Sequence, residues 1–121
     1  MVVTSNLFGD ILTDLGAAIT GGMGLAAGAN LNPEKKFPSM FEPIHGSAPD
    51  IAGQGKANPI AAVLAAQMLL ENQGYPEEGR MLHDAVRRSL DEGRTIPDLG
   101  GSLRTEEVGR YIADLVRSQK R

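Results

Sequence analysis

The sequence predicts an α/β chain with short strands and about four helices, and three observations lead to this fold class. Four segments repeat apolar residues at helical spacing between capping residues and glycines, at residues 6–19, 59–72, 76–90 and 105–116. Two short extended segments, 25–29 and 39–44, lie between the first helix and the second. The chain has 121 residues, of which 41% are hydrophobic and 22% charged, as is typical of a soluble globular domain or part of one.

The first helix is predicted by an apolar stripe that follows a candidate cap at Ser5 or Asn6. The stripe consists of Phe8, Ile11, Leu12, Leu15 and Ile19. A glycine-rich turn at residues 21–24 ends the helix. Asp10 and Asp14 lie four residues apart beside the stripe, where two like charges cost about 0.2–0.5 kcal/mol. Two interpretations stay open: solvated carboxylates, or a pair of oxygen ligands for one hard divalent ion.

The stretch of residues 41–59 has the composition of a turn, yet it joins an extended segment to the start of a helix. Pro38 and Pro43 disfavour helix before it, because proline fixes φ and removes a backbone donor. Asn58 is a natural N-cap, with Pro59 at the first helical position. A connection from a strand end to a helix N-terminus is where open α/β sheets bind ligands.

The side chains of this stretch suit a dinucleotide. Gly46, Gly53 and Gly55 permit positive φ and close backbone approach, and backbone N–H groups at such a turn suit a phosphate. Ser47 can donate and accept, while the Asp50 carboxylate suits a ribose diol and repels a 2′-phosphate. The stretch therefore favours NAD over NADP. On spacing alone a plain surface loop is the more frequent outcome, since neither a G-x-G-x-x-G nor a Walker A pattern is present.

The later helices are predicted by their apolar sides and their glycine stops. The second has Ile60, Val63, Leu64, Met68 and Leu70 on one side and stops at Gly74. The third begins at Pro76, buries Leu82, Ala85, Val86 and Leu90, and closes at Gly93; His83 lies off its stripe and is assigned to the surface.

A second Gly/Pro loop, residues 95–102, precedes the last helix. Thr105 is predicted to cap that helix, with Glu106 and Glu107 in its first turn. Tyr111 falls on its apolar stripe and is assigned to the core rather than to proton transfer.

Composition excludes several classes of function. A net charge of −3 and a pI near 5.3 give no basic patch for nucleic acid. The absence of cysteine excludes disulfides, thiolate metal sites and cysteine catalysis. No apolar run reaches transmembrane length and no signal peptide is visible, so we expect no membrane partner and a cytoplasmic location.

The string EPIHGSAPDIAG at residues 42–53, followed by ANP at 57–59, resembles the adenosine-binding loop of the metal-dependent β-decarboxylating dehydrogenases. That family contains isopropylmalate, isocitrate, tartrate and D-malate dehydrogenases, and the resemblance implies the C-terminal part of their fold. It also implies that the adenosine half of NAD is bound by this loop, with Glu42 facing the nicotinamide side. The implied cofactor-binding residues are Glu42, His45, Gly46, Ser47, Ala48, Pro49, Asp50, Ile51 and Asn58.

The string NLFGDILTD at residues 6–14 is similar to the family segment that carries two of three metal-binding aspartates. The resemblance implies that Asp10 and Asp14 bind Mg²⁺ or Mn²⁺, while the third aspartate comes from a segment outside this sequence, across a homodimer interface. It implies that residues 1–20 end a small, dimer-forming domain. Residues 21–121 would be the C-terminal part of the large, cofactor-binding domain.

The activity implied is NAD-dependent, metal-assisted oxidative decarboxylation of a 2-hydroxy dicarboxylic acid of tartrate, D-malate or 3-isopropylmalate type. No residue here matches the family's substrate arginines or its catalytic tyrosine and lysine, so no catalytic residue is assigned. We expect the C-terminal portion of a longer subunit, inactive by itself. The alternative is a catalytically inactive NAD-binding or regulatory and dimerisation module derived from the family.

Overall fold

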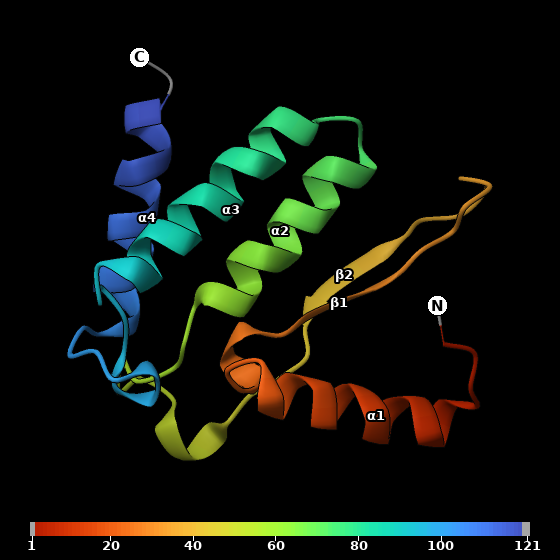
Figure 1. Ribbon diagram of the computed structural model, residues 1–121, viewed down its shortest axis with the longest axis horizontal. Helices are drawn as coiled ribbons and strands as arrows, with labels where there is room; N and C mark the ends of the chain where they lie inside the picture. The colour runs from red at the N-terminus through yellow and green to blue at the C-terminus, as the bar shows by residue number, and fades with distance from the viewer. Residues whose placement is uncertain (1, 120–121) are drawn as a thin grey trace.

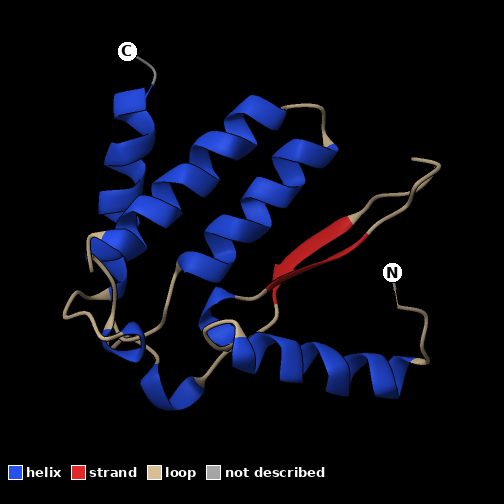
Figure 2. Ribbon diagram, in the orientation of Figure 1, coloured by secondary structure: helices blue, strands red, loops and turns tan. Residues whose placement is uncertain are grey.

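The computed structural model describes residues 2–119 and contains four α-helices with one small sheet (Figures 1 and 2). The helices are α1 (Asn6–Ile19), α2 (Ile60–Asn72), α3 (Pro76–Asp91) and α4 (Thr105–Gln119). The strands are β1 (Ala27–Asn30) and β2 (Met40–Pro43), and three 3₁₀ turns are η1 (Met23–Leu25), η2 (Pro49–Ile51) and η3 (Pro97–Leu99). The predicted α/β class and helix number are confirmed. None of the helices between residues 2 and 119 is long and apolar enough to cross a membrane.

The core lies where α2, α3 and α4 pack together. Its buried residues are Ile60, Ala85, Val86, Ile96, Val108, Ile112 and Leu115. Helix α2 lies between α3 and the two strands, so it is contacted on more than one side (Figure 1). Its fully buried residues are Ile60, Ala61 and Ala65, whereas the predicted apolar side at Val63, Leu64, Met68 and Leu70 is only partly buried.

The sheet is a two-stranded antiparallel hairpin in which Ala27 pairs with Pro43 and Asn30 with Met40. The second strand matches its prediction. The first begins two residues later than predicted, because residues 23–25 form η1, in which the Leu25 amide donates to the Gly22 carbonyl at 3.1 Å. The hairpin tip projects away from the helices (Figure 2).

Helix α1 confirms the predicted helix, but its apolar stripe is exposed. Phe8 is 60% exposed, Leu15 59% and Ile19 87%, and only Ala17 is buried. The helix lies apart from α2, α3 and α4 and joins them through η1 (Figure 1). The amphipathic pattern therefore identified the helix correctly, while nothing in residues 2–119 covers its apolar side.

The predicted cap at Asn58 is confirmed by geometry. Its Oδ1 accepts from the Ile60 amide at 3.0 Å, the bond expected of an N-cap when Pro59 is the first helical residue. The assigned start of α2 at Ile60 differs by one residue, as helix bounds commonly do. At the start of α1, Ser5 occupies the cap position without a side-chain hydrogen bond.

The predicted cap at Thr105 is wrong. Arg104 occupies the cap position: its carbonyl accepts from the Val108 amide at 3.1 Å, and the Glu107 carboxylate accepts from its amide at 2.7 Å. The bond from the cap-residue amide to a glutamate three residues later is one of the two hydrogen bonds that make up a capping box. The Thr105 hydroxyl leaves the helix and donates to the Ala57 carbonyl instead.

Candidate functional site

The segment from β2 to α2, residues 44–59, forms one continuous loop around η2, and we call it the nucleotide loop after the ligand that the sequence predicts for it. The Ile44 amide still donates to the Ala26 carbonyl at 3.0 Å, so the loop starts from a fixed strand end. Ala48 adopts a left-handed conformation with φ +42°, a state that costs a non-glycine residue energy. Gly53 and Gly55 also have positive φ, +74° and +66°. The predicted need for glycine is met at these two positions, whereas Gly46 does not adopt a positive φ.

Most of the predicted nucleotide-binding side chains are brought together on this loop and face solvent. Glu42 on β2 and residues 46–50 are exposed, whereas His45 and Ile51 are half-buried. The backbone carbonyl of Asp50 accepts from Gln54 Nε2 at 2.7 Å, which closes the turn after η2. The Asp50 carboxylate is engaged by no hydrogen bond or ion pair within residues 2–119, so it is free to accept from a ligand.

His45 carries a buried polar atom without a partner. Its Nδ1 lies 3.2 Å from the Gly46 carbonyl oxygen, while Nε2 is shielded from solvent and has no hydrogen-bond partner in the described chain. Buried polar atoms are nearly always paired, and an exception points to an unfilled binding role or to strain. The position of His45 at the start of the nucleotide loop favours a binding role.

Asn58 differs from the other predicted nucleotide-binding residues because its side chain is 8% exposed and already occupied. Oδ1 caps α2, and Nδ2 donates to Asp98 Oδ2 at 3.2 Å. Each amide atom of Asn58 thus already has one partner within the protein, which fixes the orientation of the side chain.

The second Gly/Pro loop and the start of α4 each contact the nucleotide loop, and the sequence did not predict these contacts. Asp98 bonds to Asn58, and Thr105 donates to the Ala57 carbonyl oxygen at 2.5 Å, across 40 and 48 residues of sequence. The glycines and proline of residues 95–102 predicted the loop itself. No periodicity or cap signal indicates a partner so far away along the chain.

Asp10 and Asp14 are both exposed on α1, one turn apart as predicted. Asp10 Oδ2 accepts from Asn6 Nδ2 at 3.3 Å, and Thr13 Oγ1 donates to the Asp10 carbonyl at 3.0 Å. No group of three or more His, Cys, Asp or Glu side chains able to hold a metal occurs in the described residues. The pair therefore supplies two oxygen ligands, fewer than Mg²⁺ or Mn²⁺ takes, and fits an ion only together with ligands from elsewhere.

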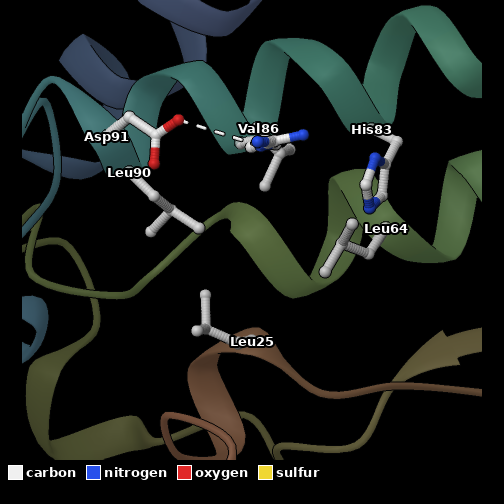
Figure 3. Close-up of a pocket in the computed structure, with 7 residues that line it drawn as sticks. Leu25, Leu64, His83, Val86, Leu90 and Asp91 are labelled. Atoms are coloured by element: carbon white, nitrogen blue, oxygen red, sulfur yellow. Dashed lines mark ion pairs between the residues drawn. The ribbon is translucent and has the colours of Figure 1, made fainter.

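An apolar cavity of about 280 Å³ lies between η1, α2 and α3 (Figure 3). It is lined by Leu25, Leu64, His83, Val86 and Leu90, with an Arg87–Asp91 ion pair of 3.8 Å at its rim. His83, predicted to be a surface residue, is exposed and forms one edge of it. None of the predicted site residues lines this cavity.

The fold is of the isocitrate dehydrogenase type. A crystal structure of isocitrate dehydrogenase from Methylococcus capsulatus matches with a TM-score of 0.88 and 46% identity, over 95% of this chain and 34% of that chain. A β-decarboxylating dehydrogenase from Thermococcus kodakarensis matches with a TM-score of 0.82 and 44% identity, over 93% and 32%.

Sequence comparison defines the family. Residues 1–112 match the model of isocitrate/isopropylmalate dehydrogenase. A 3-isopropylmalate dehydrogenase from Thermobifida fusca is 54% identical over 119 residues, 98% of this chain and 33% of the relative. A tartrate dehydrogenase/decarboxylase from Pseudomonas putida is 51% identical over 119 residues, 94% and 33%. The chain therefore belongs to the isocitrate/isopropylmalate dehydrogenase family, and it spans about a third of the length of these curated relatives.

Proposed function

We propose that this chain supplies the adenosine-binding half of an NAD site and two metal-binding carboxylates to an oxidoreductase. The enzyme would catalyse metal-assisted oxidative decarboxylation of a 2-hydroxy dicarboxylic acid. The observation that carries the proposal is the nucleotide loop, which presents an unengaged Asp50 carboxylate beside exposed Ser47 in a chain of this family.

The nucleotide loop fits the adenosine end of NAD in three respects. Ala48 is held in a left-handed conformation, which turns the backbone sharply between Ser47 and Pro49 and suits close approach of a ligand. His45 Nε2 offers a hydrogen-bonding atom that the protein leaves unpaired. Asp50 supplies an acceptor for a ribose diol and would repel a 2′-phosphate. Together these features favour NAD over NADP.

Asp10 and Asp14 would hold one face of a Mg²⁺ or Mn²⁺ ion. A bound divalent ion supplies Lewis-acid stabilisation of negative charge on a substrate oxygen. The chain's own contribution is to keep two carboxylates one turn apart on a helix, where Asn6 Nδ2 donates to the Asp10 carboxylate. The remaining ligands, the substrate clamp and the acid and base would come from polypeptide outside these 121 residues.

We infer that residues 1–20 belong to a dimer-forming domain and residues 21–121 to the large domain of such an enzyme. The exposure of the α1 stripe and its separation from α2, α3 and α4 support this division. The relatives are named for isopropylmalate, tartrate and homoisocitrate. These are all 2-hydroxy acids with further carboxylates, so that class is proposed for the substrate.

Calorimetric titration of the chain with NAD and with NADP tests the cofactor. The wild type should bind NAD more tightly than NADP, and Asp50→Lys should reverse the preference, because a cation attracts the 2′-phosphate that the carboxylate repels. The matched control is Asp84→Lys, which makes the same charge change on the exposed face of α3. A wild type that binds neither dinucleotide would contradict the proposal.

Electron paramagnetic resonance of added Mn²⁺ tests the metal pair. The chain should bind the ion weakly, and Asp10→Asn or Asp14→Asn should abolish that binding while Asp84→Asn leaves it unchanged. If the chain binds NAD but Asp10→Asn and Asp14→Asn leave Mn²⁺ binding unchanged, the result would favour the second candidate, an inactive NAD-binding module of the family. Steady NADH production by the 121-residue chain alone would overturn the expected dependence on further polypeptide.

A further inference from the structure

We propose that Asp98 and Thr105 are positioning residues that hold the C-terminal end of the nucleotide loop, residues 54–58, in its binding geometry. The inference rests on the proposed function, because it concerns the affinity of the same loop for the adenosine end of NAD. We call the segment of residues 98–105 the latch.

Thr105 binds the loop through both its hydroxyl and its amide. Oγ1 donates to the Ala57 carbonyl at 2.5 Å, and the Thr105 amide donates to the Gly55 carbonyl at 2.9 Å. Two carbonyls of the loop, two residues apart, are thus fixed by one residue at the start of α4. The backbone between them has little freedom to rotate while both bonds are made.

The Thr105 hydroxyl is not needed by its own helix. The amide at the cap position, that of Arg104, is satisfied by the Glu107 carboxylate at 2.7 Å. The hydroxyl of a threonine at the start of a helix commonly accepts a hydrogen bond from a backbone amide of the first turn. Here the hydroxyl points to a carbonyl 48 residues earlier, so its effect is on the nucleotide loop rather than on α4.

Arg104 adds a third contact. Its Nη2 donates to the Gln54 carbonyl at 3.3 Å, and its Nε would lie 2.9 Å from a Cβ built on Gly55. Gly55 therefore leaves the space that the guanidinium occupies, in addition to adopting φ +66°. Both latch residues 104 and 105 thus act on the stretch from Gln54 to Ala57.

Asp98 holds Asn58, the last residue of the stretch 54–58. Its Oδ2 accepts from Asn58 Nδ2 at 3.2 Å, which leaves Asn58 Oδ1 directed at the Ile60 amide. Gly24 closes on this pair: a Cβ at that position would lie 2.9 Å from both Asn58 Nδ2 and Asp98 Oδ2. Three segments meet here, so the orientation of the Asn58 amide is set by Asp98 and Gly24 as well as by the start of α2.

The test is calorimetric titration of the 121-residue chain with AMP, at a temperature where circular dichroism shows every variant folded. Thr105→Val removes the hydroxyl and keeps the shape, and we expect AMP to bind about five- to tenfold more weakly. Thr105→Ser restores the hydroxyl and should return the Kd to within about twofold of the wild type. Asp98→Asn keeps an acceptor oxygen and should bind AMP more tightly than Asp98→Ala.

The control is Thr20→Val, which removes a hydroxyl that donates to the Gly16 carbonyl at 2.9 Å, far from the latch in sequence. It should leave the Kd unchanged. If Thr105→Val lowers the melting temperature but binds AMP like the wild type, the latch serves stability only and the inference is overturned. If the wild type binds no AMP, the proposed function itself fails, and this inference fails with it.

Discussion

The Tyr111 hydroxyl donates a hydrogen bond to the Glu92 carboxylate and so joins α4 to the C-cap residue of α3. Arg88 Nε binds the same carboxylate at 2.7 Å, and the Arg94 guanidinium lies 5.0 Å from the centre of the Tyr111 ring. Tyr111 thus packs its ring beside the core, as predicted, while its hydroxyl serves a polar contact on the surface.

This contact gives the chain a defined pH dependence. Hydrogen bonds from Tyr111 and Arg88 hold the pKa of the Glu92 carboxyl below its ordinary 4.5. The Glu92 hydrogen bond raises the pKa of Tyr111 above its ordinary 10.0. Because the pKa of Glu92 is lower in the folded chain than in the unfolded chain, the charged carboxylate stabilises the fold at pH values above the unfolded-state pKa. This stabilisation is lost as the pH falls through the folded-state pKa. Because the pKa of Tyr111 is higher in the folded chain, the neutral phenol stabilises the fold at pH values below the unfolded-state pKa. This stabilisation is lost as the pH rises through the folded-state pKa.

Tyr111→Phe should therefore lower the melting temperature most between about pH 5 and pH 10 and progressively less outside that window. Thermal melts across pH for the wild type and the variant measure this difference. Tyr75→Phe is the control, since Tyr75 is 54% exposed and its hydroxyl has no partner in the described chain. A gap between Tyr111→Phe and the wild type that stays constant down to pH 3 would contradict the assignment.

Replacing each of two glycines by alanine should change the free energy of unfolding in opposite directions. A Cβ at Gly101 would lie 2.0 Å from the Thr95 carbonyl oxygen, which is itself bonded to the Leu103 amide. Gly101→Ala should cost about 3 kcal/mol or more, because backbone must move to relieve the overlap. A Cβ at Gly109, inside α4, would meet nothing within 4 Å. Gly109→Ala should stabilise the chain by about 0.5–1 kcal/mol.

Urea unfolding of the two alanine variants measures both effects. Equal stabilities for Gly101→Ala and Gly109→Ala would show that residues 95 and 101 are not in the close contact described.

Two isoleucines test which helices share the core. Ile112 in α4 is 3% exposed, whereas Ile11 in α1 is 49% exposed. Ile112→Ala should lower the free energy of unfolding by about 2–5 kcal/mol through lost burial and a residual cavity. Ile11→Ala should change it by no more than about 0.5 kcal/mol. A large loss at Ile11, measured by the same urea unfolding, would mean that the α1 stripe is covered in solution.

Helix positions were predictable because their signals are local. Gly74 follows the end of α2 and Gly93 follows the end of α3. Their φ angles are +90° and +65°, which glycine adopts without a steric penalty. The nucleotide loop was predictable for the same reason, since proline and glycine rule out regular structure along the chain itself.

The errors arose where a distant contact overrides a local preference. Thr105 has the side chain of a cap, but the Ala57 carbonyl competes for its hydroxyl and Glu107 takes over at Arg104. The exposure of Phe8 and Leu15 could not be read from periodicity, because a stripe indicates a helix without saying what covers it. The Asp98 contact with Asn58 joins residues 40 apart, which no local pattern encodes.

Hydrogen–deuterium exchange of the chain with and without NAD tests most directly whether the nucleotide loop is the cofactor site. We expect slower exchange of backbone amides between residues 44 and 58 when NAD is present, with exchange in α3 unchanged. Exchange that is unaffected in the loop, or slowed only around the cavity between α2 and α3, would contradict it.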